Sequence, residues 1–165
     1  FSYFTMLTNI MVAVYFTFQV FIKNKPKALP NKPGALTALS VYIIVVGLVY
    51  QLFLRSAWNP SGLQRIVDEL LHSVIPVIVL VYCFAYENFK KIKYPQMLNW
   101  LVYPLIYLIF IMSRGYFSGF YPYFFVNVSE IGFKSVMLNS FFLLILFLFL
   151  SFCFTLLGKK IRIKG

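Results

Sequence analysis

Five apolar runs, each about as long as a helix that crosses a lipid bilayer, dominate this 165-residue chain. A bilayer core of about 30 Å requires about 20 helical residues, because each residue adds about 1.5 Å. The predicted spans are residues 1–22, 35–54, 66–86, 97–113 and 135–157. We therefore expect an all-α, polytopic membrane helical bundle that forms a single integral membrane domain over residues 1–165.

Composition supports this class over a soluble one. Hydrophobic residues make up 61% of the chain and charged residues 12%, whereas soluble domains have about 45–50% and about 25%. The formal net charge of +11 comes from short basic clusters between the apolar runs. Such clusters are typical of membrane orientation, so we expect membrane lipids as partners and no nucleic acid.

The basic clusters also predict an orientation. They lie in the first loop, the third loop and the C-terminal tail, whereas the second and fourth connections carry few basic residues. Because cytoplasmic loops are enriched in Lys and Arg, we expect a multi-pass protein of the cell membrane with Phe1 outside and the C-terminus cytoplasmic. The chain is already apolar at Phe1, which suggests that an upstream helix is missing and that the complete bundle has six spans.

Polar side chains collect at one predicted depth. His72, the only histidine, lies about 9 Å inside the outer start of the third span, and Thr5 lies about 6 Å inside that of the first. Asp68 is one turn before His72, and Ser2, Thr5 and Asn9 form one stripe with Thr8 beside it. Ionisable groups in a span usually line a cavity or a reaction site. Arg114 and Asn139 lie at the outer ends of the fourth and fifth spans.

Two further features lie near these residues. Pro76 has no N–H, so the carbonyl of His72 loses its helical donor and a kink or a water is expected. The fourth connection, SRGYFSGFYPYFFVNVSEIG, is aromatic and rich in Gly and Pro. It is too apolar for a solvated loop, and we expect it to cover the helix ends as a re-entrant or interfacial lid.

Each feature also has a purely structural explanation. His72 can hydrogen-bond a neighbouring helix, Thr residues can serve in packing, and Asp68 can simply mark a helix start. Arg114 can extend to lipid phosphates. Cys83 and Cys153 have no metal-ligand spacing and are expected to be small buried residues, so the sequence predicts no metal site and no cofactor.

Three segments in order carry a family resemblance: FSYFTMLTN, LHSVIP and the fourth connection. Together they resemble the androgen-induced membrane hydrolase family, which includes the androgen-dependent regulator of tissue factor pathway inhibitor, and especially its small bacterial relatives. The resemblance covers nearly the whole chain and implies a six-helix fold. It also implies a threonine hydrolase of fatty-acid esters of hydroxy fatty acids. The family's Thr motif falls best on Thr5, with Thr8 one turn away, and its His motif falls on His72.

The resulting hypothesis is an intramembrane hydrolase of lipid esters at the outer leaflet. His72 would activate Thr5, Asp68 would orient the imidazole, and Asn9, Arg114 or Asn139 would hold the substrate or the oxyanion. The alternatives are a non-catalytic scaffold or lipid-binding protein, and a small-solute or proton transporter in which His72 and Asp68 relay protons. The chain shows no internal repeat of the transporter type.

Overall fold

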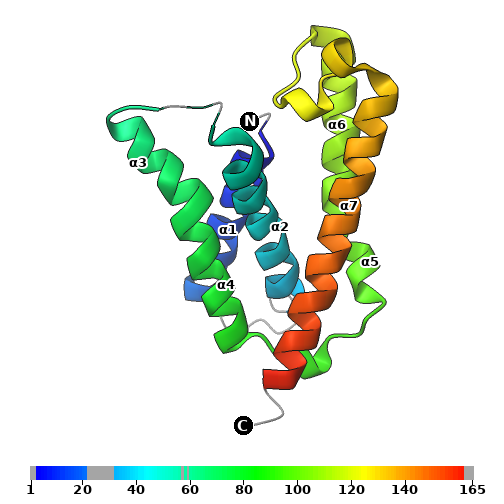
Figure 1. The fold of residues 1–165 in the computed structure, drawn as a ribbon. Coiled ribbons are helices and arrows are strands. Elements are labelled where there is room, and N and C mark those ends of the chain that lie inside the picture. Colours follow the sequence, from blue (N-terminus) through cyan, green and yellow to red (C-terminus); the bar gives the residue numbers. More distant parts are fainter. Residues whose placement is uncertain (1–2, 22–31, 57, 59, 162–165) are drawn as a thin grey trace.

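The computed structural model describes residues 3–21, 32–56, 58 and 60–161, and these residues form helices and short connections without strands. Among them, five helices are long and apolar enough to cross a membrane (Figure 1). The predicted all-α fold class is therefore confirmed. The ends of the first predicted span, the predicted location of Phe1, Ser2 of the polar stripe and most of the first basic loop lie outside the described residues.

Successive membrane-length helices run in opposite directions (Figure 1), and some change type along their length. Two segments are π-helical and two short connecting turns are 3-10 helical. The elements are α1 (Phe4–Phe21), α2 (Ala35–Val49), η2 (Tyr50–Leu54), α3 (Leu63–Glu69), η3 (Leu70–Val74), α4 (Ile75–Tyr86), η4 (Phe89–Lys91), α5 (Gln96–Trp100), α6 (Val102–Ser118), η5 (Phe124–Val126) and α7 (Val128–Ile161).

The helices extend beyond the predicted spans. The fourth span runs over Gln96–Ser118 and the fifth over Val128–Ile161, longer than the expected 97–113 and 135–157. Windows matched to bilayer thickness miss these turns, because a helix can continue past the hydrocarbon layer. Gly132 interrupts the last helix with φ 77° and ψ 156°, so its first turn is set off from the rest.

The central helix of the bundle is α2, which packs against α1, α4 and α7. Two thirds of its most apolar window (67%) is buried, compared with 11–28% for the other four spans. A helix that is apolar on all sides belongs in such a central position. On the outer helices, large apolar side chains such as Val14 and Ile109 are exposed, as expected of surfaces that face lipid.

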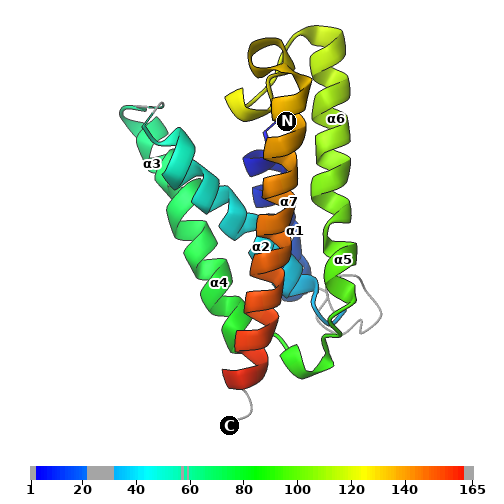
Figure 2. The same ribbon diagram turned by 45° about the vertical axis from the view of Figure 1, so that its right-hand side comes forward.

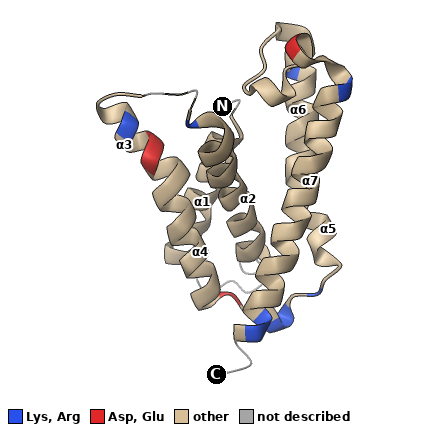
Figure 3. Cartoon of the chain, viewed as in Figure 1, with Lys and Arg blue, Asp and Glu red and all other residues tan. Residues whose placement is uncertain are grey.

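The two ends of the bundle differ in charge (Figure 3). We call one the basic end, because its described charges are six lysines and Glu87: Lys32, Lys90, Lys91, Lys93, Lys159 and Lys160. The opposite end carries Arg55, Arg65, Arg114, Lys134, Asp68, Glu69 and Glu130. We call it the lid end, since the connection 119–127, hereafter the lid, lies there. In Figures 1 and 2 the helices spread apart toward the lid end.

Candidate functional site

His72 lies in the π-helical turn η3, one turn before Pro76. In this turn the N–H of Ile75 donates to the carbonyl of Leu70, five residues earlier. Such turns are uncommon and frequently occur at functional sites. The carbonyl oxygen of His72 faces Gly47 of α2, where a Cβ would come within 3.0 Å of it. The lack of a side chain at Gly47 therefore lets α2 approach the part of the helix that Pro76 disturbs.

Asp68 anchors the imidazole. The His72 Nδ1 atom lies 2.9 Å from the backbone oxygen of Asp68 and 3.2 Å from its Oδ1. The side chains of His72 and Asp68 are only 12% and 10% exposed. The four-residue spacing predicted that these two residues share a face, and the structure places them in contact.

Tyr50 completes a group of three with them. Its ring stacks on the imidazole of His72, with 4.0 Å between centroids and 14° between planes. Its hydroxyl donates to Oδ2 of Asp68. Tyr50 belongs to the other π-helical turn, η2, which continues the buried helix α2. The two π turns thus face each other, and an aromatic ring covers one side of the imidazole.

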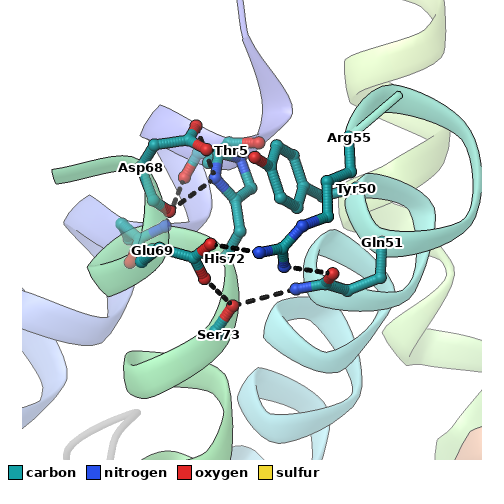
Figure 4. A network of polar contacts seen from close by, with 9 residues as sticks. Thr5, Tyr50, Gln51, Arg55, Asp68, Glu69, His72 and Ser73 are labelled. Atoms are coloured by element: carbon teal, nitrogen blue, oxygen red, sulfur yellow. Dashed lines mark hydrogen bonds and ion pairs between the residues drawn. The ribbon is translucent and has the colours of Figure 1, made fainter. Parts of the chain in front are cut away.

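A closed ring of hydrogen bonds joins η2 to the helix that carries His72 (Figure 4). Arg55 donates to Oε1 of Gln51 and pairs with Glu69. Gln51 in turn donates to Ser73 over 2.9 Å, and Ser73 donates to Glu69 over 2.8 Å. This ring is partly exposed, so each pair contributes little by itself. Its effect is to hold the two π turns in one relative position.

Thr5 of α1 lies beside Asp68 and His72 in Figure 4, and α1 packs against η3. No hydrogen bond joins Thr5 to His72, although both belong to the described part of the chain. Asn9 donates to the carbonyl of Thr5 over 2.9 Å. Thr8, the alternative, is fully buried and shares a 3.0 Å hydrogen bond with the hydroxyl of Tyr103. Of the two threonines, Thr5 is therefore the one near the imidazole.

Thr5 also lines an apolar cavity of about 90 Å³ between α1, α2, α6, α7 and the lid. Its walls are mostly Val, Leu and aromatic side chains, including Val49, Leu144 and Phe147. Thr5, Tyr107, Tyr123 and Ser140 supply the hydroxyls on this wall. Thr5 thus lies between an apolar space and the group formed by Asp68 and His72.

The lid closes this cavity with Tyr123, Phe125 and Val126. The side chain of Tyr123 lies on the same cavity wall as Thr5 and Tyr107. Burial raises the pKa of Tyr123 above its ordinary value of 10.0. The phenol therefore remains protonated and able to donate a hydrogen bond at neutral and mildly alkaline pH.

The observed lid is shorter than the predicted one. Residues 113–118 of the fourth connection continue α6, and Val128 already begins α7. Two contacts hold the remaining lid in place. The amide of Asn139 donates to the carbonyl of Phe125 over 3.0 Å, and the ring of Tyr121 covers Gly115, where even a Cβ would collide with it.

The predicted site residues fall into two groups. Thr5, Asn9, Asp68 and His72 lie together, whereas Arg114 and Asn139 contact the lid. Arg114 lies over the ring of Phe120 at 4.7 Å, and its Nη1 is buried without a hydrogen-bond partner among the described residues. Asn139 donates a hydrogen bond to the lid backbone, and this structural role accounts for its position.

The sequence interpretation did not include Tyr50 and Tyr123. Tyr50 lies near the end of the second span, which runs to Leu54, and the same comparison of depths across helices would have found it. Nothing in the spacing of residues indicates that Tyr123 lines the same cavity as Thr5, because the lid has no regular periodicity.

No protein-family model, curated protein or solved structure matches this chain.

Proposed function

We propose that this chain is an integral membrane hydrolase of lipid esters, with Thr5 as nucleophile and His72 as base. The sequence resemblance to the androgen-induced membrane hydrolases motivates this function. One observation carries it: Thr5 lies on the wall of an apolar cavity and next to an imidazole that Asp68 anchors. An alcohol needs such a neighbouring base, since it is a weak nucleophile at neutral pH.

The proposed reaction has two steps. Because Asp68 occupies Nδ1 of His72, Nε2 is the nitrogen that takes the hydroxyl proton of Thr5. The Thr5 oxygen attacks the ester carbonyl, and His72 passes its proton to the departing alcohol. Water then attacks the acyl-threonine with His72 as base, which releases the fatty acid and restores the hydroxyl. A well-placed base contributes about 10²–10⁴ in rate.

The oxyanion would be stabilised by a donor next to Thr5. Tyr123 fits this role better than Asn9, because it lines the same cavity as Thr5 and burial keeps its phenol protonated. Asn9 uses one amide N–H on the carbonyl of Thr5. Arg114, with its unpaired buried Nη1, would instead attract an acidic group of the substrate near the lid.

The surroundings of Thr5 favour an apolar acyl chain over a polar solute. The cavity is lined mainly by Val, Leu and aromatic side chains, and the substrate would enter from the lipid at the lid end. The six lysines of the basic end favour a cytoplasmic location for that end through the positive-inside bias, and the lid end would then face the outer leaflet.

A fluorophosphonate probe tests the nucleophile directly in detergent-purified protein. We expect covalent labelling and turnover of a fatty-acid ester by the unmodified chain, and loss of both in Thr5→Ala. His72→Ala should reduce the labelling rate by about 10²-fold or more. The matched control is Thr8→Ala, which removes an equivalent hydroxyl that bonds Tyr103 instead.

Labelling that persists in both Thr5→Ala and His72→Ala would exclude this pair. Folded protein that shows neither adduct nor turnover would favour the scaffold or lipid-binding alternative, and proton-coupled flux in liposomes without an adduct would favour a transporter.

A further inference from the structure

A second, more polar cavity lies at the basic end, far along the helices from Thr5. Its volume is about 250 Å³, whereas one water needs roughly 10–15 Å³ of such space. The walls come from the end of α1, the start of α2, the end of α4 and the turn η4. We call it the basic-end cavity. Its position at the helix ends corresponds to the headgroup region of a bilayer.

Glu87 provides the negative charge of this cavity. It is only 7% exposed, and its Oε2 accepts hydrogen bonds from the N–H (3.2 Å) and the hydroxyl (3.4 Å) of Thr37. Its Oε1 accepts from the N–H of Asn88 over 3.0 Å. A carboxylate next to the first turn of α2 is favoured by the unpaired N–H groups there. Oε1 accepts only one hydrogen bond and keeps a lone pair for a further donor.

Lys32 and Lys91 provide positive charge on the same walls. Within the described ranges, neither lysine forms an ion pair with Glu87 or with another acidic residue. The cavity therefore presents one buried anion and two separate cations.

Three tyrosines, Tyr15, Tyr82 and Tyr86, add aromatic surface. The rings of Tyr82 and Tyr86 lie 4.5 Å apart with 34° between their planes. Aromatic faces next to a carboxylate favour an ammonium group, through cation–π attraction and charge. Two lysines favour a phosphate.

We propose that the basic-end cavity binds a phosphate–ammonium zwitterion, as in the headgroups of phosphatidylethanolamine and phosphatidylcholine. The ammonium group lies near Glu87 and the tyrosines, and the phosphate contacts Lys32 and Lys91. An anionic headgroup without an amine uses only the two lysines and leaves Glu87 unmatched. This inference is independent of the reaction at Thr5.

Native mass spectrometry of the detergent-purified protein tests the proposal, with lipids of identical acyl chains. We expect a zwitterionic lipid, phosphatidylethanolamine or phosphatidylcholine, to be retained about five-fold more than phosphatidylglycerol. Glu87→Gln should abolish this preference, and Lys32→Met combined with Lys91→Met should weaken retention of all three lipids. The matched control is Lys90→Met combined with Lys93→Met, which changes charge equally at the same end but outside the cavity walls.

Equal retention of zwitterionic and anionic lipids by the unmodified protein would overturn the proposal. So would unchanged retention of all three lipids by the Lys32 and Lys91 double variant, whose exposed side chains are not needed for folding. This variant keeps the test decisive if Glu87→Gln unfolds. Competition by water-soluble glycerophosphoethanolamine distinguishes the source: strong competition assigns the site to a free phosphate–ammonium compound, and weak competition assigns it to the lipid.

Discussion

At the scale of single residues, the surroundings of His72 resemble those of a base that is held in one orientation. Asp68 contacts Nδ1, and Tyr50 covers one face of the ring while donating to the same carboxylate. Neither contact is needed merely to bury an imidazole, since one hydrogen bond to a neighbouring helix would suffice. Because Nδ1 is occupied, Nε2 is the ring nitrogen that would take part in a proton transfer.

Asp68→Asn tests this orientation under the proposed mechanism. Asparagine fits the same space but cannot stabilise an imidazolium, so kcat for ester hydrolysis should fall by about 10²-fold or more, with a smaller change in KM. Steady-state kinetics with a soluble fatty-acid ester would measure both constants. A kcat within two-fold of the unmodified protein would remove Asp68 from the mechanism, and Glu130→Gln at the same end serves as the charge control.

At the scale of elements, close contact between α2 and the helix of His72 depends on Gly47. Its missing side chain leaves room for the carbonyl of His72, and Pro76 packs beside it. The two π turns and the hydrogen-bonded ring of Gln51, Arg55, Glu69 and Ser73 lie one turn further along the same interface. The position of the imidazole is therefore a property of the helix pair.

Gly47→Ala should disturb this interface. A methyl group there lies 3.0 Å from the His72 oxygen, and overpacking of this kind costs about 1–3 kcal/mol. We expect a lower thermal midpoint. We also expect reduced fluorophosphonate labelling at temperatures where the variant is still folded. Val14→Ala, on the exposed face of α1, should change neither; similar effects from both variants would refute the argument.

One of the contacts that hold the lid is a hydrogen bond from α7. Asn139→Ala removes the donor to the carbonyl of Phe125, and such a bond is worth about 1 kcal/mol. Hydrogen exchange of the lid amides should become about five-fold faster, since opening of the lid then costs less. Asn99→Ala at the other end of the bundle is the control. Unchanged exchange would mean that packing of Tyr121 and Val126 alone holds the lid.

At the scale of the whole molecule, hydropathy predicted the number and order of the spans, because crossing a bilayer requires long apolar helices. Spacing predicted the contact between Asp68 and His72, since both lie on one helix. The contacts of Tyr123 and Asn139 were not predictable from spacing, and the contact of Tyr50 required a comparison of depths between helices. They join different elements, and the π turns and the irregular lid break the periodicity on which such predictions depend.

Thiol labelling tests the orientation of the bundle in intact cells. With a membrane-impermeant maleimide, we expect Ser61→Cys at the lid end to react from outside and Lys93→Cys at the basic end to react only after permeabilisation. The native Cys83 is buried and Cys153 is partly buried, so the unmodified chain provides the background. The reverse pattern would place the proposed site on the cytoplasmic leaflet.

The π turn Leu70–Val74 also has a consequence for tolerance to deletions. A π turn holds about one residue more than a regular α turn, so removing one residue here would leave an unbroken helix. The segment before it would then rotate by about 100° relative to α4. Asp68 would swing away from Tyr50 while the hydrophobic length of the span hardly changed. Such a shortened chain would insert normally yet lose its polar cluster.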